Sequence, residues 1–532
     1  MKKAPPSRGP SILLPKELAM SKTAKGLLAA LIICVLAVVG GLFACKPLVE
    51  QAVRDVLRNI NPDATICSVE TVDINPLSFT LKLGNIHISD QRTYDTVMKE
   101  ASVTLSPRFV LACVPFLRDS ILPATGDAPL FSSATGRDLI ETSMAPGDPV
   151  TCTVETLASG PVAMDAAVLK RLLNGQQVPG GELLIAIIAE KISHGPVHLS
   201  STTPEAQMQS SVAAVSIEGV NRRSWKRVTM DATEITIRSE AALKMGKLEI
   251  RDIFLPDADW FGRFLDLVNR ADTIGVDGFD LQFEALIREI VRPQKDAAGK
   301  QMMTQPFFGQ LTIKEVDIIE SPGRKNENLF HASDMQFDWL GLAPHHFKSS
   351  LTCDFSTKPL REMFVIPGKE RIALKWQDDT LEKTGPAGEN LLRQTGRLSL
   401  ESLVDLDYAY NFFSEDPSMM DAAVSDLSLD LHDHGLTAVL AYNIDPRPEA
   451  MEAMMPLLGA SLSSDLHDPS DAEALQTFLA RPGSLSIRSE DPAQLMPWIQ
   501  FLDASALGRM LAFTATPGEK SLLEQMKALT AH

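Results

Sequence analysis

The sequence has few aromatic residues and few cysteines, and it lacks a net positive charge. Aromatic residues make up 6% of the 532 residues, and only 6 cysteines are present. So few cysteines in a chain of this length exclude a disulfide-framework fold. The formal charge of -18 argues against a protein whose main task is to wrap DNA or RNA, because neutralising phosphates requires a net basic surface. We therefore expect no nucleic-acid partner.

The motifs of common enzymes are missing as well. The sequence contains no GxSxG, HExxH, GxGxxG or GxxxxGK[ST] motif. The familiar signatures of hydrolases, zinc proteases, dehydrogenases and NTPases are therefore absent. We predict a protein that is not an enzyme, with no catalytic residues, no cofactor and no metal. A periplasmic hydrolase with an unrecognised site is the alternative.

One long apolar run, from Gly26 to Ala44, is present between Lys25 and Lys46. As a helix, its 19 residues would be about 28 Å long, which matches a bilayer core of about 30 Å. The first 25 residues carry 6 basic side chains and 1 acidic side chain, so the positive-inside rule places this tail in the cytoplasm. We predict a bacterial inner-membrane protein whose bulk is periplasmic. A cleaved signal peptide and a lipidated Cys45 are the alternatives.

Alternating apolar and polar residues beyond this run predict β-strands. Thr71 to Ile74 and Ser78 to Ser89 flank Asn75-Pro76 and are expected to form a hairpin. Segments starting at Gly246, Gly309 and Gly396 share one strand pattern, and a buried strand is predicted from Leu183 to Ala189. Helices are predicted at Asp165 to Asn174, Asp257 to Arg270, Pro448 to Leu458, Ser470 to Ala480 and Ala493 to Leu502.

These patterns predict an α+β fold. A single N-terminal transmembrane helix is followed by an elongated β-rich periplasmic region with interspersed helices and a helix-rich C-terminal part. The predicted boundaries are a basic cytoplasmic tail at 1–25, the transmembrane helix at 26–44, the β-rich region at 46–420 and a mixed strand and helix region at 421–532.

The best candidate for a metal site is the set Asp430, His432 and His434, because alternate residues share one face of a strand. We favour a solvated strand end for these residues, since Gly435 indicates a turn and a further ligand would be needed. His345-His346 is interpreted as a loop feature.

A basic cluster runs from Arg222 to Arg227 around Trp225, and it is either a solvated turn or a contact for anionic lipid. Cysteines Cys67, Cys113, Cys152 and Cys353 lack CxxC spacing, which argues against a thiolate metal site. Whether one or two disulfides form among these cysteines is not determined by the sequence.

The apolar run, an amphipathic stretch after it, the segment at 72–90 and Ala101 to Pro107 together resemble the opening of AsmA-like bacterial envelope proteins. The resemblance covers residues 26–115, and the Gly-x-Leu-x-Ile segments are similar to the strand repeats of that family. It implies a function in cell-envelope and outer-membrane biogenesis, with lipid bound or moved along an apolar β groove. A membrane-tethered scaffold that binds an envelope protein and no lipid is the alternative, in which the apolar face packs against helices.

Overall fold

The chain falls into two compact units in the computed structural model, and we describe each unit separately. The first unit comprises Met1–Val228 and Ile253–Arg292, and the second comprises Thr229–Asp252 and Pro293–His532. The structure describes residues 64–75, 78–91, 94–113, 116–143, 150–174, 176, 178–201, 208–238, 241–269, 281–283, 285–286, 294–295, 301–302, 308–320, 327–342, 345–360, 364–384, 390–413, 423–466, 468–497 and 510–531.

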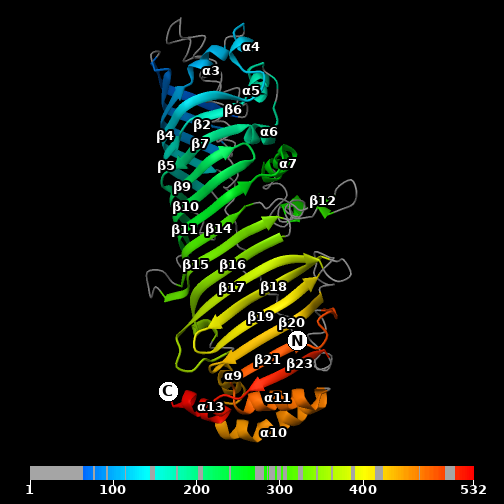
Figure 1. Cartoon of the computed structure of the whole chain (residues 1–532). Helices are drawn as coiled ribbons and strands as arrows, with labels where there is room; N and C mark the ends of the chain where they lie inside the picture. The colour runs from blue at the N-terminus through cyan, green and yellow to red at the C-terminus, as the bar shows by residue number, and fades with distance from the viewer. Residues whose placement is uncertain are drawn as a thin grey trace, which may run out of the picture. The chain divides into compact units, whose positions relative to one another are not determined.

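Strand pairing dominates both units, so the predicted α+β class is wrong and is corrected to a mainly β protein. Strands account for 59% of the structure and helices for 23%. All strand pairs run antiparallel within each unit (Figure 1). Among the residues that the structure describes, no helix is both long and apolar enough to cross a bilayer. The predicted helix at 26–44 itself lies outside the described residues.

In the first unit, strands that follow one another along the chain pair with one another. β1 pairs with β2, β2 with β3, β3 with β4 and β4 with β5, and the later strands extend the sheet through β4–β6, β6–β7, β5–β8 and β7–β9 pairs. The β1–β2 hairpin confirms the prediction around Asn75. The strands are β1 (Ile66–Asn75), β2 (Thr80–Ser89), β3 (Tyr94–Leu105), β4 (Asp127–Ser143), β5 (Val150–Ser159), β6 (Val162–Asp165), β7 (Ile187–His194), β8 (Val197–Ser201) and β9 (Met208–Asn221).

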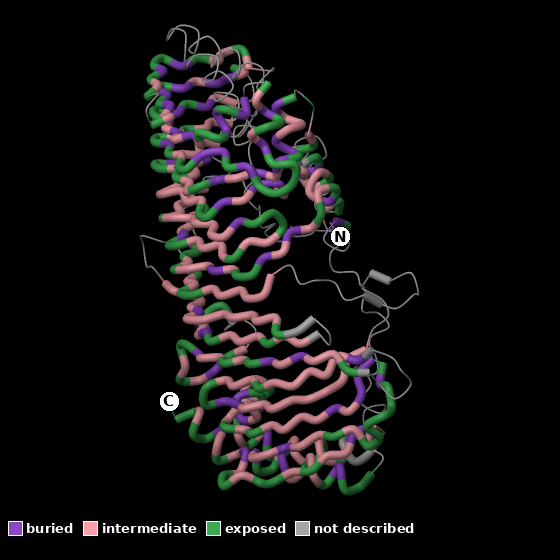
Figure 2. Tube along the Cα trace, turned by 45° about the horizontal axis from the view of Figure 1, so that its top comes forward, coloured by how far each residue is buried: buried purple, intermediate pink, exposed green. Residues whose placement is uncertain are grey.

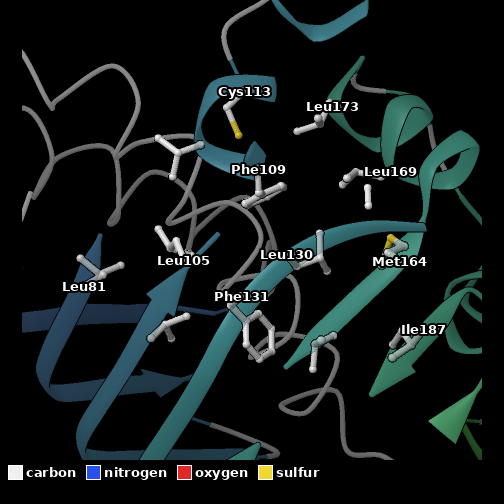
Figure 3. Packing of buried hydrophobic residues seen from close by; sticks show 14 of the residues in the cluster. Leu81, Leu105, Phe109, Cys113, Leu130, Phe131, Met164, Leu169, Leu173 and Ile187 are labelled. Atoms are coloured by element: carbon white, nitrogen blue, oxygen red, sulfur yellow. The ribbon is translucent and has the colours of Figure 1, made fainter. Parts of the chain in front are cut away.

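Helices cover part of one face of this sheet. Figure 3 shows Phe109 of α3 and Leu169 of α5 above Leu130 and Met164 of the strands, in one buried apolar cluster. Helix α5 starts where the Asp165 carboxylate accepts hydrogen bonds from two backbone N–H groups of its first turn. The helices of this unit are α3 (Pro107–Ala112), α4 (Arg118–Ile121), α5 (Ala166–Leu173), α6 (Gly180–Ile185) and α7 (Ala258–Asn269).

In each of β1 to β5, the alternation of inward-facing and outward-facing residues is interrupted once, at positions that are paired with one another from strand to strand. We call this line of interruptions the crease. At the crease, successive inward-facing residues are three positions apart instead of two, and two less buried residues, such as Gly84 and Asn85 in β2, separate them. Asn85 and Asp138 adopt left-handed backbone conformations there, with φ of 48° and 52°. The inward-facing pairs are Val69 and Val72, Leu83 and Ile86, Met98 and Ala101, Gly136 and Leu139, and Val154 and Leu157. The crease therefore lets both halves of each strand direct apolar side chains to the same core.

The second unit contains a meander in which each strand pairs with the next. β11 pairs with β14, and β14 to β20 follow in chain order, after which β20 pairs with β21 and β22, and β21 with β23 (Figure 1). The strands are β11 (Ala241–Phe254), β14 (Gln310–Glu320), β15 (Glu327–Leu342), β16 (His345–Ser356), β17 (Arg371–Thr384), β18 (Asn390–Leu400), β19 (Val404–Phe413), β20 (Ala423–Asp433), β21 (Ser484–Ser489), β22 (Met496–Pro497) and β23 (Leu511–Thr516). The strand segments predicted from Gly246 and Gly309 are thus confirmed in β11 and β14. The segment predicted from Gly396 is confirmed only as far as Leu400, where β18 ends before a turn.

The remaining elements are β10, which like β11 has residues in both units, a short hairpin, a 3-10 helix and the C-terminal helices. Figure 1 shows α10, α11 and α13 beside the last strands of the second unit. A cluster around Met451 packs helices together, a cluster around Val439 joins helices to strands, and a cluster around Leu427 lies among the last strands. The elements are β10 (Ser224–Ile237), β12 (Gln294–Lys295), β13 (Gln301–Met302), η1 (Lys358–Leu360), α9 (Leu436–Ile444), α10 (Pro448–Asp465), α11 (Pro469–Ala480) and α13 (Leu522–Thr530).

Candidate ligand-binding face

The meander of the second unit has one apolar face and one charged face. Directly paired residues of antiparallel strands point to the same side of a sheet. Leu248 is paired with Ile313, whereas the next pair along the strands, Lys247 and Lys314, points to the opposite side. The same alternation continues through β15 to β19, so we call the two sides the apolar face and the polar face.

The apolar face carries unbroken rows of large side chains from strand to strand. One row passes through directly paired residues on five consecutive strands, and all of its members are half-buried. Its members are Met335, Leu351, Trp376, Leu398 and Leu406. In Figure 2, β14 to β19 are drawn mainly in the colour of half-buried residues.

Helices cover only an end of the apolar face in the part of the chain that the structure describes. Ile372 of β17 packs with Val439 of α9 at that end. Towards the middle, the main contacts of β14 to β18 are with their neighbouring strands. Apolar side chains are normally buried against a second layer. The half-exposed rows are therefore the part of this unit best suited to hold an apolar ligand.

Aromatic rings enlarge the apolar face on β15 and β16. The ring centroids of Phe337 and Phe347 lie 5.4 Å apart in a stacked arrangement, and Trp339 lies 5.8 Å from Phe347. Such pairs contribute beyond the area they bury, and they keep side-chain positions fixed. This end of the face is thus a preformed aromatic surface.

A hydrogen-bonded polar network interrupts the apolar face on β17 and β19. The Tyr408 hydroxyl donates to Asp378 Oδ1 at 2.7 Å and accepts from Trp376 Nε1 at 2.8 Å. Thr380 Oγ1 donates to Asp378 Oδ2 at 2.8 Å. Asp378 and Thr380 are only 5% and 3% exposed. Burial and the hydrogen bond to Asp378 raise the pKa of Tyr408, which keeps its phenol protonated.

Gly396 makes room for this network. It is directly paired with Tyr408, and a Cβ at this position would lie 2.4 Å from the Tyr408 ring and hydroxyl. The Tyr408 ring therefore covers the backbone of Gly396, which has no side chain of its own, and this is a recurrent way of stabilising a glycine within a sheet.

Sequence reasoning identified Gly396 only as the start of a strand pattern, whereas it lies inside β18. The alternation of Trp376, Asp378 and Thr380 was the available signal for the network.

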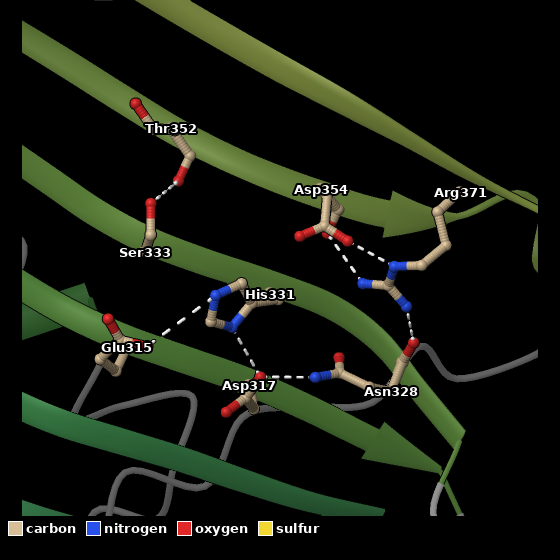
Figure 4. A network of polar contacts seen from close by, with 8 residues as sticks. All are labelled: Glu315, Asp317, Asn328, His331, Ser333, Thr352, Asp354 and Arg371. Atoms are coloured by element: carbon tan, nitrogen blue, oxygen red, sulfur yellow. Dashed lines mark hydrogen bonds and ion pairs between the residues drawn. The ribbon is translucent and has the colours of Figure 1, made fainter. Parts of the chain in front are cut away.

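The polar face is lined with ion pairs and hydrogen bonds. Figure 4 shows His331 between the carboxylates of Asp317 and Glu315, with His331 Nδ1 2.8 Å from Asp317 Oδ1. The same figure shows Arg371 in an ion pair with Asp354. Such half-exposed pairs contribute little individually. Together they make this side of the sheet strongly polar.

The predicted metal candidates do not converge. Asp430 accepts hydrogen bonds from Arg488 Nη2, which holds the pKa of Asp430 below its usual value. His432 Nδ1 lies 2.8 Å from Ser484 Oγ, and His434 Nε2 lies 3.2 Å from Asp405 Oδ2. Within the described ranges, no group of three or more His, Cys, Asp or Glu side chains is placed to bind a metal.

The other predicted features also have local partners. Arg222 lies in a turn, and its Nη2 is 3.0 Å from carboxylate oxygens of both Asp127 and Asp165, while Trp225 packs against the core of the first unit. The turn interpretation of the basic cluster therefore holds for Arg222 and Arg223, whereas the rest of the cluster belongs to β10, which begins at Ser224.

The histidine pair lies in a strand instead of a loop, because β16 begins at His345, and His346 Nε2 is 2.7 Å from Asp379 Oδ1. No disulfide joins the four cysteines of the described chain, Cys67, Cys113, Cys152 and Cys353.

Comparisons with known proteins give no relative for this chain. No protein-family model, no curated protein and no solved structure matches it. Its function must therefore be argued from its own residues.

Proposed function

We propose that this protein binds the acyl chains of lipids along the apolar face of its second unit and acts in cell-envelope biogenesis outside the cytoplasm. The observation that carries the proposal is the row of half-exposed apolar side chains across β15 to β19, which no described helix covers at its middle. Five strands spaced about 4.8 Å apart give a path of roughly 19 Å. A path of this length and chemistry suits an extended hydrocarbon chain.

An acyl chain fits this face better than a polar ligand does. The row from Met335 to Leu406 contains no charged side chain, and the hydrogen bonds of the nearby Asp378 network are made within the network. Large continuous apolar patches on proteins mark binding sites for apolar partners. The resemblance of residues 26–115 to AsmA-like envelope proteins supports a role in lipid movement and in outer-membrane biogenesis. We propose no catalytic activity.

The scaffold alternative has one observation in its favour. Trp339, Trp376 and Tyr408 lie on the apolar face, and tryptophan and tyrosine are enriched at the centres of protein interfaces. In this alternative, the apolar face docks an envelope protein and binds no lipid.

Site-specific photo-crosslinking distinguishes the two functions. A photoreactive residue replaces Leu351 on the apolar face, and the matched control replaces its neighbour Ser350, which faces the opposite side of the same strand. After illumination in cells, the full chain is purified and attached lipid is detected by mass spectrometry. We expect lipid on the Leu351 variant and none on the Ser350 variant. A protein adduct at Leu351 without lipid would support the scaffold, and equal labelling at both positions would refute a face-specific site.

A further inference from the structure

A second surface, separate from the apolar face, has the properties of a binding site. A cleft of about 270 Å³ lies on the polar face over β11, β14 and β15. Three cationic side chains line it, Lys247, Arg251 and Lys314, together with the acidic Glu249 and Asp334. Its remaining lining is made of Gln and Thr side chains, so hydrogen-bond donors outnumber acceptors. The charge of its lining is +3 - 2 = +1, in a chain whose net charge is -18.

Glu249 holds two of the cations in place at the base of the cleft. It is only 8% exposed, and its carboxylate accepts from Lys247 Nζ at 2.7 Å and from Arg251 Nε. The hydrogen bond from Lys247 is the largest cause that lowers the pKa of Glu249, so this carboxylate stays ionised. An ammonium has three N–H donors and a guanidinium has five. Both cations therefore keep further donors for a ligand.

Lys314 is the unbalanced charge of the cleft. It forms no ion pair with any residue that the structure describes, and it is the direct cross-strand partner of Lys247. Like charges in directly paired positions destabilise a sheet. On the other side of Lys314, β15 places Asp334 as its direct partner, yet the two side chains are not in ion-pair contact. Two facing lysines above a buried, paired glutamate are an arrangement that a bound anion would stabilise.

We propose that this cleft binds an oxyanion, specifically a phosphate group, between Lys314, Lys247 and Arg251. Arg and Lys hydrogen bonds to phosphate oxygens are charge-assisted and are among the stronger contacts a protein makes. The phosphate can belong to a small soluble molecule or to a lipid headgroup. Because the cleft and the apolar face lie on opposite sides of the sheet, this site is independent of the proposed acyl-chain site.

Calorimetric titration of the full chain with inorganic pyrophosphate at low ionic strength tests the proposal. We expect saturable binding that Lys314→Gln weakens about tenfold. The matched control is Lys375→Gln, because Lys375 is exposed on the same polar face, on β17, and forms no ion pair with the described residues. This control is expected to change the affinity less than twofold. Absence of saturable binding, or equal weakening by both substitutions, would overturn the proposal.

Thermal unfolding gives a second readout that does not depend on affinity. Lys314→Gln removes the repulsion with Lys247, so the variant without ligand should melt at a higher temperature than the wild type. Pyrophosphate should raise the melting temperature of the wild type clearly more than that of the variant, whose affinity is about tenfold weaker. A lower melting temperature for the unliganded variant would refute the repulsion on which the site rests.

Vesicles containing phosphatidic acid distinguish the two sources of phosphate. Vesicle binding that depends on Lys314 and is competed by pyrophosphate would assign the site to lipid headgroups. Pyrophosphate binding without vesicle binding would assign it to soluble phosphates. Both outcomes support the oxyanion site.

Discussion

Tyr408→Phe tests whether the polar network within the apolar face holds β17 and β19 together. The substitution removes one hydroxyl and with it two hydrogen bonds, the one to Asp378 and the one from Trp376. A hydrogen bond to a carboxylate contributes about 1.5–3 kcal/mol and a neutral one about 0.5–1.5 kcal/mol. Because Asp378 is almost fully buried, water cannot replace the lost partner. We expect a loss of about 3 kcal/mol in local stability.

Hydrogen exchange measured by mass spectrometry on peptides from β17 to β19 is the suitable assay, since it reports the opening free energy of those strands alone. A loss of this size makes exchange roughly a hundredfold faster. Tyr410→Phe is the matched control, because the Tyr410 hydroxyl donates to the neutral side chain of Gln394. It should cost about 1 kcal/mol. Equal effects of the two substitutions, or a change below about 0.5 kcal/mol for Tyr408→Phe, would refute the reasoning.

Four further predictions concern Tyr408, its neighbour Gly396 and the core of the first unit. Gly396→Ala should lower the melting temperature, with a cost of about 1–3 kcal/mol, since the new methyl group meets the Tyr408 ring. Leu130→Ala should destabilise the first unit by about 2–5 kcal/mol in urea unfolding, whereas Leu111→Ala, at a position 45% exposed, should be nearly neutral. The raised pKa of Tyr408 means that its contribution to stability is complete below pH 10, the usual tyrosine value, and is lost as the pH rises further, which unfolding measured between pH 8 and 11 would reveal. Burial raises the pKa of Cys113 to about 12, so peptide mapping should show it to be alkylated by iodoacetamide at pH 8 far more slowly than Cys152.

Local signals in the sequence predicted several elements correctly. The alternation around Asn75 gives the β1–β2 hairpin, and α5 and α11 each begin after an aspartate that caps the first turn, Asp165 and Asp468. These features depend on neighbouring residues alone, so sequence reasoning reaches them.

Features that depend on tertiary contacts were missed or wrong. The apolar run Leu183 to Ala189 was predicted as one strand, but α6 ends at Ile185 and β7 begins at Ile187. A short apolar run carries no period that separates helix from strand, and here Gly181 packs closely against α7. The predicted helix from Ala493 contains β22 in its described part.

The candidate sites show the same division between local and long-range information. The alternation of Asp430, His432 and His434 was visible in the sequence, but their partners lie on other strands or in later parts of the chain. The network around Asp378 and the facing lysines of the cleft exist only through strand register. Register depends on pairings between distant segments, which a single sequence does not specify.

The crease restricts which insertions and deletions the strands of the first unit can accept. Deleting one residue at Gly84-Asn85 would give β2 an uninterrupted alternation of apolar and polar positions, so the strand would look more regular by itself. Its neighbours β1 and β3 would still contain their three-residue steps, and beyond the deletion the hydrogen-bond ladder of β2 would slip by one residue against both. No one of the five strands can therefore lose its three-residue step unless the other four lose theirs as well. Length variation among homologous chains should be confined to the turns between strands and be absent from the strands themselves.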